Sequence, residues 1–262
     1  MTEKDASLPP APHRQLKDAP LIRVLCQVRW PNTANFDLDH VARVLAAKVG
    51  EYYPVLDRKD EVEFIFTPQG VSQKPTGAIH LLSSADDAWT VSLGGNFLAL
   101  ETSAYRGHQD FLQRLEVLLE ALVGAAQIPQ CTRLGYRYTN RVLGEGDLAS
   151  LNTCFDPSVV GLVAPEGLGL VKTQSVSEAV FGTPDARLLV RSSYLPPDTT
   201  IDPTISPVSE PSWLLDIDAF DEQKVHSFAT KLIVERATQL ANLANTTFFA
   251  LVRPDFYVRY DK

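Results

Sequence analysis

The sequence predicts an α+β fold, in which an antiparallel sheet carries amphipathic helices on one face. Short runs of alternating polar and apolar residues recur along the chain, and three longer stretches place apolar residues at helical spacing. Tight turns such as Gly94-Gly95-Asn96 join neighbouring runs directly, which is typical of antiparallel strands. The helices are expected near residues 38–53, 108–127 and 222–245.

The first half of the chain is predicted to open with a strand and a helix. Residues 21–30 alternate in polarity as far as Pro31, as a half-buried strand does. The helix over 38–53 has Asp37 as its N-cap and ends before Pro54. Four short strands of an antiparallel meander follow, near residues 62–67, 78–83, 89–93 and 97–103.

The second half looks like a looser copy of the first. The arginine-bearing strand over 133–141 precedes it, and within it strands are expected near 170–177, 187–195 and 213–220 before the helix over 222–245. In both halves an apolar strand with a carboxylate leads to an aromatic residue and an amphipathic helix, which fits internal duplication or an ordinary strand-to-helix connection. The last helix is expected to bury Val225, Phe228, Leu232, Ile233 and Leu240.

We expect a single α+β domain over 21–262 after a flexible tail over 1–20. Within that domain, 21–143 and 150–262 are candidate sub-lobes. Residues 196–211 form a long loop that is rich in Pro, Asp, Thr and Ser and has no regular period. Because loops of this length inside a compact domain are rarely passive, we consider a lid, a partner-docking segment or local disorder.

Composition narrows the function classes. The 262-residue chain has a net charge of −8 and a pI near 5.1, and no run of Lys or Arg offers the basic patch that nucleic acid needs. No apolar stretch is long enough to span a bilayer and no signal-like segment opens the chain, so we expect a cytoplasmic protein without membrane contact. The three cysteines lack C-x-x-C spacing and are expected to be buried thiols: Cys26, Cys131 and Cys154.

The arginine-bearing strand is the most informative part of the sequence. Arg133, Arg137 and Arg141 lie four residues apart, so an extended strand places them on one face, each roughly 13 Å from the next. One interpretation is cross-strand pairing with the carboxylates of Glu101, Asp216 or Asp218. The other is a site for a small anion or a carboxylate-bearing peptide.

The pair Asp216 and Asp218 has two interpretations of its own. Two carboxylates on one strand face can hold a divalent cation or act as an acid and base pair. No further ligand at suitable spacing accompanies them, so we favour ion pairs with arginines of neighbouring strands and expect no metal. The chain also lacks the nucleophile elbow, phosphate loop, dinucleotide fingerprint and His-Glu-x-x-His motif, so no cofactor is expected.

Several segments taken together resemble a sporadically distributed family of uncharacterised bacterial proteins of about this length. The segments are residues 20–31, NFLALET (96–102), RLGYRYTNR (133–141) and LLDID (214–218). The resemblance covers about residues 20–250, and the C-terminal segment over 248–262 departs from it. It implies a soluble bacterial protein in an accessory, defence or mobile-element role, whose recurring segments contain Glu101, Arg137, Asn140, Arg141 and Asp218.

From these observations we expect a binding or interaction protein, although its pathway and oligomeric state are not specified. Its arginine-bearing sheet face would recognise a partner protein or a small anion. The alternative is an enzyme acting on an anionic substrate, with strand carboxylates as acid or base and the arginines as an electrostatic clamp. The candidate ligand-binding or partner-binding residues are Arg133, Arg137, Arg141, Glu101, Asp216 and Asp218.

Overall fold

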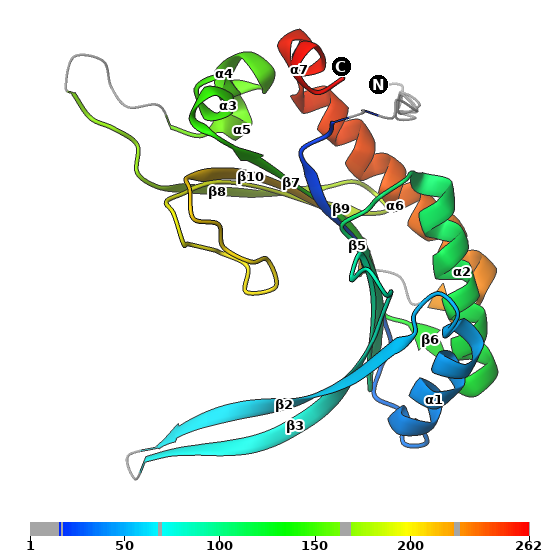
Figure 1. The fold of residues 1–262 in the computed structure, drawn as a ribbon. Coiled ribbons are helices and arrows are strands. Elements are labelled where there is room, and N and C mark those ends of the chain that lie inside the picture. The colour runs from blue at the N-terminus through cyan, green and yellow to red at the C-terminus, as the bar shows by residue number, and fades with distance from the viewer. Residues whose placement is uncertain (1–15, 17, 68–69, 163–168, 223–225, 262) are drawn as a thin grey trace. The chain divides into compact units, whose positions relative to one another are not determined.

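The structure is a computed structural model that describes residues 16, 18–67, 70–162, 169–222 and 226–261 (Figure 1). Its strands are β1 (Leu21–Arg29), β2 (Val55–Thr67), β3 (Gly70–Ser83), β4 (Trp89–Gly94), β5 (Phe97–Thr102), β6 (Gln130–Cys131), β7 (Arg133–Leu143), β8 (Ser175–Gly182), β9 (Arg187–Leu195), β10 (Ser212–Asp221) and β11 (His226–Ser227). Its helices are α1 (Leu38–Val49), α2 (His108–Ala125), α3 (Glu145–Ala149), α4 (Leu151–Cys154), α5 (Pro157–Val160), α6 (Thr230–Leu251) and α7 (Pro254–Tyr260).

The strands confirm the predicted α+β class with an antiparallel sheet. A nine-stranded sheet has the order β2-β3-β4-β5-β1-β7-β10-β9-β8, and β6 pairs with β11 separately. The order is the same in the two halves of the chain. In each half the first strand lies beside the last (β1 beside β5, and β7 beside β10), and the other strands follow outward in reverse sequence order. Internal duplication predicts this shared order.

The chain divides into two compact units. Unit 1 comprises Met1–Arg23, Arg137–Ala219 and Leu240–Lys262, and unit 2 comprises Val24–Tyr136 and Phe220–Gln239. The tail predicted over 1–20 falls mostly outside the described residues, as does Val225.

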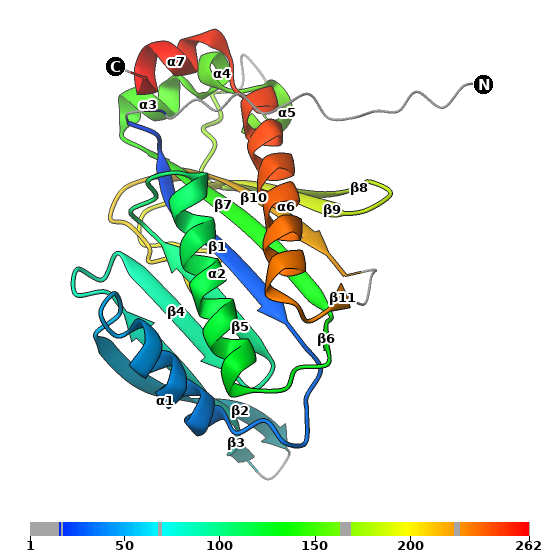
Figure 2. The same cartoon turned by 90° about the vertical axis from the view of Figure 1, so that its right-hand side faces the viewer.

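In unit 2 the helices α1 and α2 cover one face of β4 and β5 (Figure 2). Asp37 caps α1 as predicted, because its carboxylate accepts a 2.9 Å hydrogen bond from the His40 backbone N–H. The ring of Phe111 from α2 lies 5.7 Å from that of Trp89 and 5.2 Å from that of Tyr136, measured between centroids. These large apolar side chains join the helix layer to the strands.

In unit 1 an aromatic cluster forms the core on the helix-bearing side. The ring of Phe155 lies 4.6 Å from that of Trp213 on β10 and 5.3 Å from that of Phe256 on α7. Phe248 on α6 lies 5.5 Å from Phe256, which is fully buried. The C-terminal helix α7, which the sequence did not predict, is therefore part of the core of this unit.

Several predicted bounds differ from the structure. Strand β8 begins at Ser175 instead of near residue 170, and Leu170 and Val171 are exposed. Helix α6 begins at Thr230, so Phe228 precedes it, and Leu232 is exposed instead of buried. Such errors arise because an apolar run in the sequence fixes neither the bounds of an element nor the burial of each of its side chains.

Other predicted elements agree closely with the structure. Strand β9 has the predicted bounds, and Gly95-Asn96 turns β4 into β5. Helix α1 ends at Val49, four residues before the predicted end, because Gly50 is a poor helix residue. The three cysteines are free and buried, as predicted: Cys26, Cys131 and Cys154.

Candidate functional site

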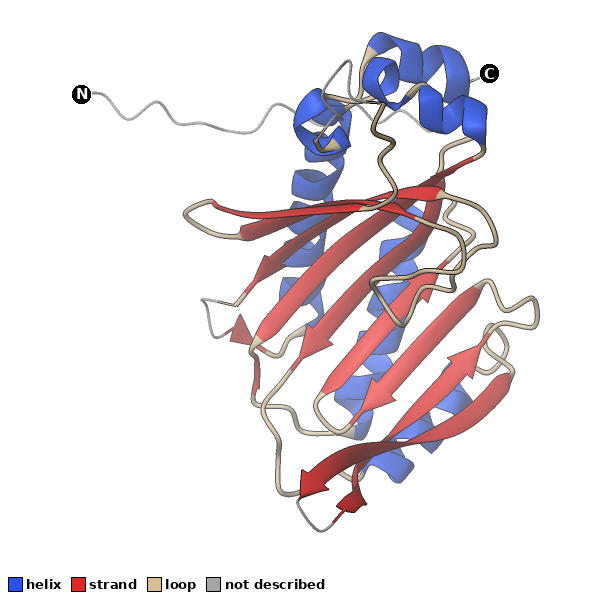
Figure 3. Ribbon diagram, turned by 90° about the vertical axis from the view of Figure 1, so that its left-hand side faces the viewer, coloured by secondary structure: helices blue, strands red, loops and turns tan. Residues whose placement is uncertain are grey.

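The long loop over Pro196–Pro211, here called the strap, lies on the face of unit 1 opposite α6 (Figure 3). Its Ile205 is buried in an apolar cluster with Leu195 and Leu214, and Ile22 and Ile201 pack against that cluster. The strap is therefore held against the sheet by apolar contacts as well as by the polar contacts described next.

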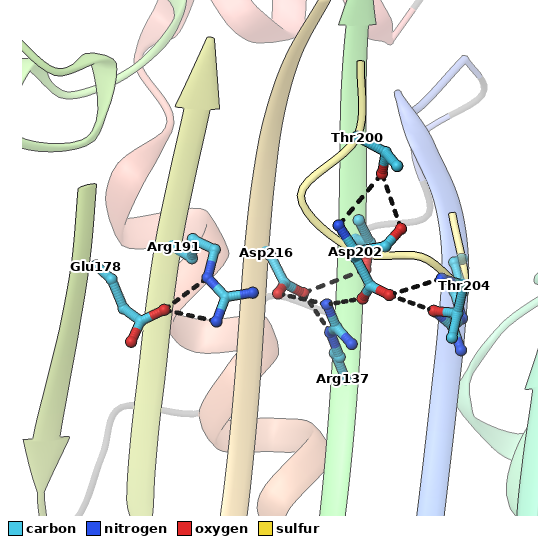
Figure 4. Close-up of polar contacts among 9 residues, drawn as sticks. Arg137, Glu178, Arg191, Thr200, Asp202, Thr204 and Asp216 are labelled. Carbon is cyan, nitrogen blue, oxygen red and sulfur yellow. Dashed lines mark hydrogen bonds and ion pairs between the residues drawn. The ribbon is translucent and has the colours of Figure 1, made fainter. Parts of the chain in front are cut away.

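A tight polar turn shapes the middle of the strap. One carboxylate oxygen of Asp202, Oδ1, accepts hydrogen bonds from the backbone N–H of Thr204 at 2.9 Å and from its hydroxyl at 2.5 Å. The hydroxyl of Thr200 donates to the Asp202 carbonyl at 2.8 Å. Arg23 on β1 donates to the Thr204 hydroxyl at 2.7 Å. These bonds occupy Oδ1 and hold the second oxygen, Oδ2, at the arginine strand (Figure 4).

Arg137 pairs with two carboxylates of its own unit. Its Nε and Nη2 atoms donate to the two oxygens of Asp216 at 2.6 and 2.7 Å, a bidentate pair between β7 and β10. Nη2 also donates to Asp202 Oδ2 at 2.8 Å. The hydroxyl of Thr139 adds a 3.2 Å hydrogen bond to Asp216. The exposed side-chain fractions are 19% for Arg137, 7% for Asp216 and 13% for Asp202, so the cluster is largely removed from water.

The protonation states in this cluster follow from its contacts. Burial opposes the charge on the Arg137 guanidinium, yet the bonds to Asp216 and Asp202 outweigh burial and raise the pKa of Arg137. Burial also opposes the charge on Asp202, but the hydrogen bonds from Thr204 and the ion pair with Arg137 lower the pKa of Asp202 to about 2. Both groups are therefore charged at neutral pH.

Further charges continue this row across the strands. Glu178 on β8 is in register with Arg191 on β9 and accepts a 2.6 Å hydrogen bond from its Nε. Figure 4 shows Glu178, Arg191, Asp216 and Arg137 following one another over β8, β9, β10 and β7. Acidic and basic side chains alternate along the row, which is the cross-strand arrangement that stabilises a sheet.

Arg141 differs from Arg137 although it has the same strand and spacing. Its backbone N–H donates to the carbonyl of Pro20 at 2.7 Å, and its Nη2 donates to the carbonyl of Ser206 in the strap at 2.9 Å. Its buried Nε atom has no hydrogen-bond partner. Burial, with no compensating charge, lowers the pKa of Arg141. Within the part of the chain that the structure describes, no carboxylate pairs with Arg141.

The structure does not bring all the predicted site residues into one group. Arg133 belongs to unit 2, where its Nε donates to Glu222 at 3.0 Å and its guanidinium lies 4.9 Å from the ring centroid of Phe220. Glu101 also belongs to unit 2, on β5, in register with Leu25 and Thr90.

The remaining predicted residues lie in unit 1. Asp218 is half-buried on β10, two residues beyond Asp216. Asn140 is buried on β7, and its amide nitrogen lies 3.5 Å from the Leu215 carbonyl. Of the three carboxylates that the sequence offered as partners of Arg137, Asp216 is the one that the structure pairs with it.

Sequence reasoning missed Asp202 as the second carboxylate at Arg137. The only local signal was Asp-Pro-Thr over 202–204, since an Asp followed two residues later by a backbone N–H donor is typical of a side-chain-stabilised turn. That signal predicts the turn but not its docking on β7, because the contact joins residues 65 positions apart.

No group of three or more His, Cys, Asp or Glu side chains among the described residues is arranged to hold a metal ion. None of the helices described here has the length and apolar character needed to cross a membrane. The chain matches no protein-family model, no curated protein and no solved structure.

Proposed function

We propose that this chain is a binding protein that recognises a carboxylate-bearing segment of a partner protein, or a small carboxylate anion, through Arg141. The observation that carries the proposal is the contrast between two arginines of β7. Arg137 has two carboxylate partners, whereas Arg141 has one backbone carbonyl. The arginine-bearing face then keeps one guanidinium for a ligand.

The chemistry of the guanidinium favours a carboxylate as that ligand. Arginine presents five N–H donors in a planar fork that matches the two oxygens of a carboxylate. In Arg141 the Nε–H donor is buried and unbonded, and such a donor costs about 1–3 kcal/mol. An arriving carboxylate would offset the burial that now opposes the charge on Arg141.

Arg137 takes a supporting role in this proposal. A ligand that bound to Arg137 would have to displace Asp216 or Asp202, and a displaced carboxylate would then be left uncompensated in a largely buried place. The pair with Asp202 instead holds the strap, and the strap presents the Ser206 carbonyl to Arg141. Arg137 is thus a positioning residue for the site.

The enzyme alternative gains no comparable support. Asp202 is ionised with a pKa of about 2, so it is not suited to exchange protons near neutral pH, and both oxygens of Asp216 accept hydrogen bonds from Arg137. We also propose a cytoplasmic location, which the three buried free thiols support because thiols stay reduced in that compartment. The resemblance to a family of uncharacterised bacterial proteins remains a prediction.

The test follows the side-chain Nε–Hε signals of the arginines by NMR. Wild-type protein is titrated separately with citrate, with inorganic phosphate and with a blocked hexaglutamate peptide. We expect a saturable shift of the Arg141 signal with citrate or with the peptide. R141Q should abolish binding, and R187Q, a change at an exposed arginine of β9, should retain it. Absence of saturation up to about 10 mM, or unchanged binding in R141Q, would refute the proposal.

A further inference from the structure

Strand β8 ends the nine-stranded sheet on one side. It pairs with β9 along its whole length, from Ser175 opposite Tyr194 to Gly182 opposite Arg187. In the strand order no described strand lies beyond β8. Its outer edge therefore presents a row of backbone N–H and C=O groups, and the partner that satisfies such a row is another extended strand.

The side chains of β8 are apolar and exposed to an unusual degree. The exposed fractions are 51% for Val176, 53% for Val180 and 55% for Phe181. Alternation along the strand places Phe181 on one face of the sheet and the two valines on the other. The one charged side chain, Glu178, is held by Arg191 of the same chain.

The other edge strand, β2, carries features that discourage pairing with a further strand, and β8 lacks them. Over residues 57–60 it carries the charged sequence Asp-Arg-Lys-Asp, and these side chains are exposed. A register shift between Glu61 and Val62 also interrupts its pairing with β3. Charges and bulges are the devices by which natural sheets discourage pairing at an edge. Strand β8 pairs with β9 without a register shift, and its one charge is paired within the chain, so β8 is the edge better suited to accept a strand.

We propose that β8 pairs antiparallel with β8 of a second copy of this chain, with Ala179 on the two-fold axis. Opposite residues of an antiparallel pair point to the same face, so the axis must pass through a residue position. An axis at Glu178 would place two glutamates opposite each other, which is unfavourable. An axis at Val180 would leave residues 175–177 unpaired. An axis at Ala179 pairs residues 176–182 and sets each Glu178 opposite a Val180.

Symmetry also favours pairing between the β8 strands of two copies. A β8-to-β8 contact uses the same edge of both copies, so the assembly closes as a dimer. A β8-to-β2 contact would join different edges and could continue as an open filament, and the exposed charges of β2 oppose it. Stable interfaces bury about 1,600 Å², more than two eight-residue strands provide. We therefore expect a weak, concentration-dependent dimer. This inference does not depend on the proposed role of Arg141.

A cysteine pair tests the register directly. In A179C the two introduced thiols would face each other at a Cα separation of about 5 Å, which permits a disulfide. In the matched control S177C, on the same face of β8, they would be roughly 13 Å apart. We expect oxidation to give covalent dimers for A179C and monomers for S177C, since the native cysteines are buried. Equal crosslinking of both variants, or of neither, would overturn the proposal.

Sedimentation equilibrium then tests the interface without a crosslink. Val180→Glu would place a carboxylate opposite Glu178 of the second copy, and because like charges in opposite positions repel, it should weaken the dimer by about tenfold or more. The matched control Leu56→Glu, at an exposed position of β2, should leave the dimer unchanged. A wild-type protein that stays monomeric up to about 1 mM, or equal effects of the two variants, would refute pairing through β8.

Discussion

Arg137 and Arg141 show how far surroundings decide what one residue type does. The two arginines share a strand, are four residues apart on the same face, and both contact the strap. Arg137 receives carboxylates from β10 and from the strap, and these raise its pKa. Arg141 receives a single carbonyl, and burial lowers its pKa. The first is a structural ion pair, and we propose the second as the ligand-binding group.

The strap accounts for this difference. Its turn at Asp202 presents a carboxylate to Arg137, and the peptide at Ser206, four residues later, presents only a backbone oxygen to Arg141. Substitution of Arg137 should therefore reduce mainly the stability of the protein, and substitution of Arg141 should reduce mainly ligand binding. Measurements of stability and binding on variants of the two residues test this difference.

The largest effect is expected from Arg137→Met. It leaves Asp216 and Asp202 as uncompensated, largely buried carboxylates, so the free energy of unfolding should fall by about 3–5 kcal/mol. Urea denaturation followed by circular dichroism measures this change. Arg187→Met, at an exposed arginine of β9, is the control and should change stability by less than about 0.5 kcal/mol. A loss below about 1 kcal/mol in R137M would show that the ion pairs contribute little.

A smaller effect is expected from Asp202→Asn. It removes the ion pair that links the strap to Arg137 but leaves the Asp216 pair, so the loss should be about 1–3 kcal/mol. Amide hydrogen exchange at Thr204, whose N–H now bonds to Asp202, should become faster. The control Asp198→Asn lies in the same strap with φ of +56°, a conformation that Asn tolerates. Equal amide exchange at Thr204 in D202N and D198N would exclude the proposal that Asp202 holds the strap on Arg137.

Acid should weaken the ion pair between Asp202 and Arg137, which holds the strap against the sheet. The folded pKa of Asp202 is about 2, below its ordinary value of 3.8, so its stabilisation is complete above about pH 4. As pH falls from about 4 through 2, about 2 kcal/mol should be lost. D202N, which cannot titrate at this position, should show a correspondingly shallower loss when urea midpoints are compared between pH 5 and pH 2. An equal loss of stability in wild-type protein and in D202N would contradict the assignment of the low pKa to Asp202.

The smallest effect on stability is expected from Arg141→Met. The change removes one hydrogen bond to Ser206 and also an unbonded buried donor, so stability should change by less than about 1 kcal/mol in either direction. Carboxylate binding in the NMR titration should nevertheless be lost. A loss of stability as large as that of R137M would show that Arg141, like Arg137, has a structural role.

Much of the local structure could be predicted from the sequence because it depends on short-range patterns. Period-two alternation predicted β9 with its observed bounds, and the Asp37 cap marked the start of α1. The same approach failed where an apolar run and an element did not coincide. Leu170 and Val171 were expected in a strand, yet they precede β8 and are exposed.

The sequence by itself determined that three arginines would share one face of a strand, because side chains alternate along an extended backbone. It also offered Asp216 as a partner for these arginines, together with Glu101 and Asp218, but it did not offer Asp202. Only the tertiary structure decided that Asp216 and Asp202 neutralise Arg137 while Arg141 keeps a single carbonyl. The physical reason is distance along the chain. These contacts join residues 65–79 positions apart, so they depend on strand register and on the docking of the strap.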